Sequence, residues 1–235
     1  SELSLSKVDL NIPLNNIEKI CKNSFSKTVK LNFVYYKNKA YVSADPTQIE
    51  QFLLNLCVNA EHAMTIMRNP GEKRGGILTV TIDKIFADAS FCSTHKNAKE
   101  QPYWVISTQD NGIGMDPKLK DKIFDPFFST KGAGKGTGLG LSMVYNIVEQ
   151  HDGFIEVYSE PGIGTTFNVY LPEFIGEIES EPDEKANDEL MMGSGLILVI
   201  DDEQIMRELA RNILEKCGYR VICAEEGVTG IEQFI

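Results

Sequence analysis

The chain has 235 residues, of which 42% are hydrophobic and 24% charged, which suits one full domain plus a smaller piece. Its formal net charge of −11 argues against nucleic acid or an anionic membrane surface as a direct partner. No stretch approaches the roughly 18 apolar residues of a membrane span, there is no signal peptide, and five scattered cysteines without a Cys-x-x-Cys pair suit a reducing cytoplasm and no structural metal site.

The hydrophobic pattern predicts an α/β sandwich. In chain order, we expect strands near 8–10, 29–36, 40–44, 77–86, 103–109, 153–159 and 165–171 and helices near 13–25, 46–67, 116–121 and 138–151. The polar residues 87–102 lie between two expected strands, so we expect a surface loop there.

The helix expected over 46–67 carries an unusual polar face. Asp45 suits the N-cap and Pro46 the first helical position. The apolar stripe faces the core, whereas Gln51, Asn55, Asn59 and His62 recur three or four residues apart on another face. Asparagine is a mediocre helix former, but its carbonyl oxygen is a suitable ligand for Mg²⁺. A solvated polar face is the alternative for either asparagine alone.

Two glycine clusters follow, in Asp110-Asn-Gly-Ile-Gly-Met115 and at alternate positions from Gly132 to Gly140. Glycines let backbone N–H groups approach an anion closely, and a helix that starts near Gly138 would add its N-terminal dipole. This pattern predicts a phosphate-binding site and therefore a bound nucleotide. Neither the dinucleotide-binding fingerprint nor the P-loop spacing fits, and a lone glycine run is more often a flexible loop.

Four motifs in order resemble the ATP-binding catalytic domain of bacterial sensor histidine kinases, within the superfamily shared with gyrase B, MutL and the heat-shock chaperone ATPases. Asn55-Leu-Cys-Val-Asn59 is similar to its N box, 110–114 to its G1 box, 124–128 to its F box and 136–140 to its G2 box. The resemblance covers about residues 8–172. It implies a two-layer sandwich of the Bergerat (GHKL) type, with a mixed sheet packed on helices.

The resemblance also implies roles for individual residues. Asp110 would accept a hydrogen bond from the adenine amino group, and Ile113 and Met115 would pack near the base. Asn59 would ligate the Mg²⁺ that bridges the ATP phosphates, with Asn55 close to the same oxygens.

Further site residues follow from the same boxes and from the lid between them, about residues 126–137. We expect Phe127 and Phe128 to act as lid hinge or plain core, and His62 either to contact ATP or to lie partly exposed on its helix. The remaining implied ATP-binding residues are Gly112, Gly114, Lys131, Gly136, Thr137, Gly138, Leu139, Gly140 and Leu141.

Asn55 separates the branches of this superfamily. The ATP-hydrolysing branches place a glutamate there as a general base, and an amide cannot take up a proton at neutral pH. We therefore expect phosphotransfer, and the resemblance implies that the acceptor of the γ-phosphate is a histidine on a preceding helical hairpin that is missing here. Residues 1–7 would be the end of that hairpin or a linker, and the chain a piece of a larger, homodimeric protein.

A second signal lies near the C-terminus. Residues 173–194 are acidic and poor in core formers, as in a solvated linker. Residues 195–235 resemble the start of a flavodoxin-like response-regulator receiver domain, whose acidic pair after the first strand, here Asp201 and Asp202, binds Mg²⁺. The family's phosphorylated aspartate lies beyond Ile235, so we expect this partial segment to be loosely held, docked on the first domain or completed by another chain.

The sequence thus predicts the ATP-binding part of a hybrid sensor histidine kinase, which acts with Mg²⁺, a histidine-bearing dimerisation domain and a receiver domain or response regulator in a phosphorelay. One alternative is an ATPase of the gyrase/MutL type. The other is a non-enzymatic nucleotide sensor or docking module.

Overall fold

The computed structural model describes residues 4–68, 71–72, 74–95, 97–120, 122–128, 138–176, 193–202, 204–227 and 230. The described residues divide into a first unit up to residue 174 and a second unit from residue 175 onward.

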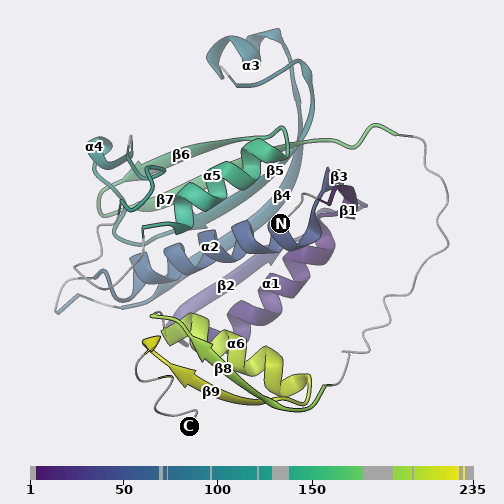
Figure 1. The fold of residues 1–235 in the computed structure, drawn as a ribbon. Helices are drawn as coiled ribbons and strands as arrows, with labels where there is room; N and C mark the ends of the chain where they lie inside the picture. Colours follow the sequence, from purple (N-terminus) through teal and green to yellow (C-terminus); the bar gives the residue numbers. More distant parts are fainter. Residues whose placement is uncertain are drawn as a thin grey trace. The chain divides into compact units, whose positions relative to one another are not determined.

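The first unit is built on one five-stranded mixed sheet (Figure 1). Its strand order is β2 (Val29–Val34), β4 (Gly76–Ala87), β5 (Gln101–Asp110), β7 (Gly164–Pro172) and β6 (Phe154–Glu160). β2 runs parallel to β4, and the other neighbours are antiparallel. A separate antiparallel pair joins β1 (Ser6–Asp9) to β3 (Tyr41–Ala44). The expected mixed sheet and all seven expected strands are confirmed.

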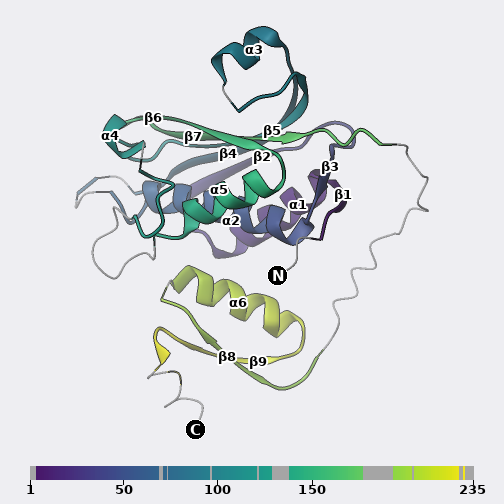
Figure 2. The ribbon, with the colours of Figure 1, turned by 45° about the horizontal axis from the view of Figure 1, so that its top comes forward.

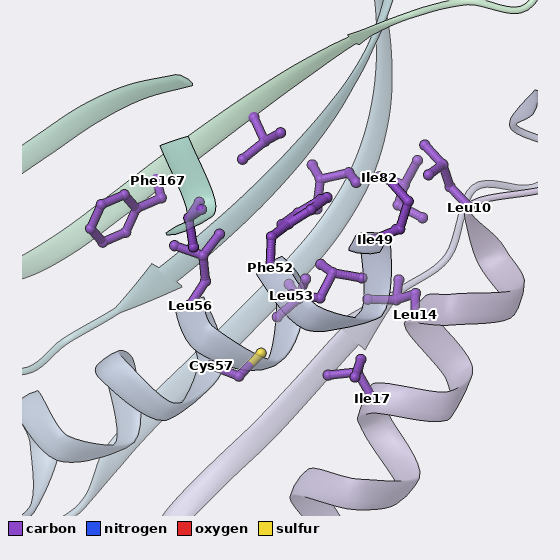
Figure 3. Packing of buried hydrophobic residues seen from close by; sticks show 14 of the residues in the cluster. Leu10, Leu14, Ile17, Ile49, Phe52, Leu53, Leu56, Cys57, Ile82 and Phe167 are labelled. Atoms are coloured by element: carbon purple, nitrogen blue, oxygen red, sulfur yellow. The ribbon is translucent and has the colours of Figure 1, made fainter. Parts of the chain in front are cut away.

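Three helices form the second layer of the sandwich, on one face of the sheet (Figure 2). They are α1 (Asn11–Ser24), α2 (Pro46–Met64) and α5 (Gly140–Gln150), and the short α4 (Pro117–Lys120) follows β5. The main core lies between these layers, where α1 and α2 pack on each other and on the sheet (Figure 3). Its central side chains are fully buried: Leu10, Leu14, Ile17, Ile49, Phe52, Leu53, Leu56 and Cys57.

The ends of α2 follow from local chemistry. The Asp45 side chain caps its start by accepting hydrogen bonds from the backbone N–H groups of Thr47 and Gln48, at 2.9 and 3.3 Å. This confirms the expected start. The helix ends at Met64, three residues before the expected end, because Thr65 leaves the helical region at φ −123° and ψ −82°.

The surface loop expected over 87–102 is wrong in part, because it contains helix α3 (Ala89–Thr94). The Asp88 carboxylate caps this helix by accepting from the Phe91 N–H at 2.8 Å, a signal that is visible in the sequence. Phe91 packs with buried residues of the other sheet face, Ala87, Tyr103, Val105, Phe154 and Tyr170. The inserted segment therefore covers part of a face that would otherwise be exposed.

The second unit contains β8 (Leu196–Ile200), α6 (Gln204–Lys216) and β9 (Arg220–Ala224), and its two strands pair in parallel. The expected strand–helix–strand order is confirmed. Among the buried hydrophobic residues of the described chain, this unit contributes Ala224 alone. None of the helices in the described ranges is long and apolar enough to cross a bilayer.

Candidate functional site

Asp110 lies at the end of β5, at the edge of the core. It pairs in register with Leu78 of β4 and with Thr165 of β7, so both neighbouring strands enclose it. The side chain is only 6% exposed, and one carboxylate oxygen accepts a hydrogen bond from the Gly112 N–H at 2.7 Å. The sheet thus holds an acceptor in a fixed orientation, largely removed from water.

Burial changes the acidity of this carboxyl. Loss of solvation raises the pKa of Asp110 to about 6, even though backbone hydrogen bonds from Gly112 and Thr165 and the positive charge of Arg68 act in the opposite direction. A buried carboxylate that is ionised near neutral pH is a strong acceptor for a ligand N–H group.

The loop after Asp110 is packed tightly against α2 and the β6–β7 turn. A Cβ atom at Gly112 would lie 2.8 Å from the backbone of Ala63, and the Ile113 N–H donates to the Ala63 carbonyl at 3.2 Å. Gly114 has a φ of 64°, and a Cβ there would lie 2.0 Å from the Glu160 carbonyl oxygen. The Met115 N–H donates to Ser159 Oγ at 2.9 Å. These contacts explain why glycine occupies both positions.

The polar face of α2 meets the start of α5. Asn55 and Asn59 are both half-buried, and a Cβ added to Gly140, the first residue of α5, would lie 3.2 Å from Asn55 Oδ1 and 3.9 Å from Asn59 Nδ2. The Asn55 amide donates to the Gln51 carbonyl at 3.0 Å, which leaves its oxygen directed toward Gly140. Because Gly140 has no Cβ, a phosphate group or a cation bound to it can approach the amide groups of Asn55 and Asn59. The residues present therefore fit a magnesium-bound phosphate, since amide oxygen is a hard ligand.

The partly exposed position considered for His62 is wrong. Its exposure is 4%, and its Nε2 lies 4.0 Å from Glu61 Oε2. The loop after Asp110 packs on the adjacent Ala63, at the same end of α2.

The N-terminus of α5 is suited to bind an anion. No side-chain cap hydrogen bond is made by its N-cap residue, Leu139, and the helix has 11 residues, so its first N–H groups and its dipole favour negative charge. Leu139 is 37% exposed, whereas Leu141 packs against the core. The expected helix start at 138 is wrong by two residues, because Gly138 adopts a φ of 67°.

A backbone hydrogen bond joins the two ends of the lid. The Phe127 N–H donates to the Gly138 carbonyl at 3.0 Å, and Phe127 itself has a φ of 66° and is 78% exposed. Phe128, by contrast, packs against the main core. The core alternative therefore holds for Phe128 and not for the exposed Phe127, whose role as a lid hinge stays a prediction. Lys131, Gly136 and Thr137 lie outside the described residues.

The structure brings further residues to Asp110 that the sequence reasoning missed. Thr165 is 6% exposed, and its hydroxyl lies 2.8 Å from Ser159 Oγ. The sequence does contain a signal for Thr165. It is a polar residue at the alternate positions of β7 that also hold the buried Phe167 and Val169. Arg68, after the end of α2, donates from Nη2 to the Asn111 carbonyl at 2.9 Å. No sequence pattern indicates this contact, because it joins two loops.

The other predicted metal ligands lie in the second unit. Asp201 and Asp202 directly follow β8, and the Arg207 guanidinium donates to the Asp201 carbonyl oxygen at 2.7 Å. Over the ranges that the structure describes, no group of three or more His, Cys, Asp or Glu side chains is placed to hold a metal ion.

The comparisons with known proteins agree with this geometry. Residues 44–175 match the family described as histidine kinase-, DNA gyrase B-, and HSP90-like ATPase, a range that includes α2, β5, α5 and β7. The sensor kinase CckA of Brucella abortus is 36% identical over 234 residues, covering 96% of this chain and 24% of that protein. Sensor histidine kinase ZraS of Escherichia coli is 35% identical over 173 residues, covering 73% of this chain and 32% of that protein.

Solved structures are similar to the same part of the chain. The nucleotide-free catalytic domain of histidine kinase ThkA has a TM-score of 0.56 and 26% identity, and it covers 72% of this chain and 96% of that one. Full-length ShkA in complex with AMPPNP has a TM-score of 0.57 over 99% of this chain and 43% of that one, and at 21% identity it shows the fold alone. The chain spans about a quarter to a third of the length of the curated relatives named above.

Proposed function

Since the chain belongs to the family of histidine kinase-, DNA gyrase B- and HSP90-like ATPases and carries a catalytic domain of the histidine kinase type, we propose that it binds Mg-ATP for phosphoryl transfer. The acceptor in the parent protein is a histidine on a separate helical hairpin, and the parent is a homodimer. A receiver domain or response regulator then takes the phosphoryl group in two-component signalling.

The adenine end of the site is at Asp110, at the end of β5. The buried carboxylate accepts a hydrogen bond from the adenine amino group, which is supported by its burial and by its fixed bond to Gly112. Ile113 and Met115 lie on the loop that packs beside it, so their side chains border the base. Thr165, next to Asp110 on β7, adds a hydroxyl at the same place.

The phosphate end is the junction of α2 and α5. Asn59 would hold Mg²⁺ at the phosphates with Asn55 beside it, and the N–H groups at the start of α5 would bind phosphate oxygens. When bound, Mg²⁺ supplies charge that neutralises the phosphates during transfer. Lys131, Gly136, Thr137 and Gly138 are the further residues that we assign to ATP binding at this end, the first three outside the described residues.

The observation that favours phosphotransfer over hydrolysis is the amide side chain of Asn55. Its amide oxygen is directed to Gly140 at the phosphate end, where an amide cannot deprotonate water. Catalysis by this domain is therefore positioning and charge stabilisation for an external nucleophile. The same residue disfavours a gyrase/MutL-type ATPase.

The second unit is the beginning of a receiver domain. Its parallel β8–α6–β9 arrangement and the carboxylates of Asp201 and Asp202 at the end of β8 support this proposal, because ligands bind at the carboxyl ends of parallel strands. The match to CckA extends over 96% of the chain, which includes residues of this segment.

The decisive experiment is calorimetric titration of the chain with a non-hydrolysable ATP analogue, with and without Mg²⁺. We expect micromolar, magnesium-sensitive binding and no appreciable ATP hydrolysis. Asn59→Ala should abolish the magnesium sensitivity and leave the magnesium-free affinity unchanged.

Gln51→Ala is the matched control, since Gln51 is an exposed amide two turns earlier on the same helix. Rapid hydrolysis by the wild type would favour the ATPase alternative, and no binding would favour a docking module. Persisting magnesium sensitivity in Asn59→Ala would place the metal on another residue.

A further inference from the structure

Arg68 connects two loops at the edge of the nucleotide site. It follows α2, where its backbone N–H donates to the Thr65 carbonyl at 3.3 Å. Its Nη2 donates to the carbonyl oxygen of Asn111 at 2.9 Å, directly after Asp110. The segment between α2 and β4 is thereby joined to the loop that follows β5.

Asn111 is held from a second side as well. Its Oδ1 accepts a hydrogen bond from the Ile77 N–H at 2.7 Å, near the start of β4. With the Asn111 carbonyl on Arg68 and its side chain on β4, this residue has little freedom to rotate. The neighbouring Gly112 N–H is therefore held where it donates to the Asp110 carboxylate.

The charge of Arg68 acts on the same carboxylate. Among the described residues, it is the charged group whose field lowers the pKa of Asp110, against the larger effect of burial. The Arg68 Nε atom is buried and has no hydrogen-bond partner in the described part of the chain. Burying an unused donor destabilises a fold, so stability alone does not explain this placement.

We propose that Arg68 is a positioning residue of the nucleotide site, which fixes the loop after Asp110 so that the Asp110 carboxylate is held in place to accept the adenine amino group. The inference rests on the proposed function of Asp110. It adds a residue outside the four sequence motifs, supplied by the connection between α2 and β4.

The test measures the affinity of the chain for a non-hydrolysable ATP analogue between pH 5 and pH 8. Binding by the wild type should weaken as the pH falls through about 6, where Asp110 takes up a proton. Arg68→Met should weaken binding roughly three- to tenfold at pH 7.5 through loss of a charged hydrogen bond, and should move the pH midpoint upward. Arg68→Lys should keep the wild-type midpoint, because it keeps the charge.

Arg74→Met is the matched control, since Arg74 is exposed in the same connection and should change neither quantity. NMR titration of the Asp110 carboxyl in the nucleotide-free protein, assigned with Asp110→Asn, follows the charge effect without ATP. If the wild type binds and Arg68→Met changes neither affinity nor midpoint, the inference about Arg68 is overturned. If the wild type fails to bind while Arg68→Met still shifts the Asp110 titration, the proposed function fails instead.

Discussion

At the scale of single residues, Asp110 combines a cost to the fold with a benefit to binding. Because its pKa is raised to about 6, folding favours the neutral form of Asp110 more than the unfolded chain does. The contribution of the neutral carboxyl to the free energy of unfolding is fully present below the unfolded pKa near 4. It is lost as the pH rises through 6. At pH 7.5 the nucleotide-free domain therefore holds a buried charge at a cost of about 2–3 kcal/mol.

We expect Asp110→Asn to separate the two effects. At pH 7.5 it should raise the free energy of unfolding by about 1–2 kcal/mol, since the amide needs no charge solvation, and at pH 4 the gain should vanish. The same variant should bind the ATP analogue roughly ten- to a hundredfold more weakly. Urea denaturation at both pH values and calorimetry provide the measurements, and equal stability changes at both pH values would contradict the burial argument.

The residues of the sequence motifs could be predicted from the sequence, whereas the residues that contact them in the fold could not. Asp110 stands out because a carboxylate follows an apolar strand pattern beside glycines, and Asn59 because it lies one turn after Asn55 on a helix otherwise rich in apolar residues. Thr165 pairs with Asp110 across the sheet, but threonine is common in strands, so its identity alone carries no signal. Arg68 depends on a contact between two loops, and spacing along the chain contains no information on such a contact.

At the scale of elements, the junction of the lid with α5 depends on Gly138. A Cβ at this position would lie 2.4 Å from the backbone of Phe127, and residues with a side chain rarely adopt the φ of 67°. We expect Gly138→Ala to break the Phe127–Gly138 hydrogen bond, to destabilise the domain by about 2 kcal/mol and to weaken binding of the ATP analogue about tenfold.

Gly71→Ala is the control that measures backbone strain without a steric clash. Gly71 also has a positive φ, of 93°, but no atom lies within 4 Å of a Cβ added there. It should cost about 1 kcal/mol and leave affinity unchanged, as measured by denaturation and calorimetry. Equal effects of the two variants would show that the contact with Phe127 is unimportant.

The elements themselves were largely predictable, and the exceptions have physical causes. Hydrophobic periodicity located the long helices and all seven strands of the sandwich, since each buries one face. Helix α3 was missed because it is only six residues long and has no amphipathic repeat, although its Asp88 cap was visible. The start of α5 was placed too early because glycine conformation depends on the tertiary contact with Phe127.

At the scale of the whole molecule, both described hydrophobic clusters consist of residues between Val8 and Leu171. We expect a chain that ends at residue 176 to keep the melting temperature of the first unit within about 2 °C, because this truncation removes none of that core. Its affinity for the ATP analogue should also be unchanged. A large fall in either quantity would show that the second unit contributes to the fold or to the site.

The hydrogen bond between Phe127 and Gly138 has a consequence for how chains of this kind can diverge. It connects positions 127 and 138, and the entropic cost of bringing the ends of a chain segment together rises only with the logarithm of the segment's length, by about 0.6 kcal/mol for each doubling. Extra residues inserted between these two positions would therefore lower the stability of the fold only slightly and leave the positions of α2, β5 and α5 unchanged. This point in the chain is open to lengthening, whereas the α2–Asp110 contact at Gly112 tolerates not even one added methyl group.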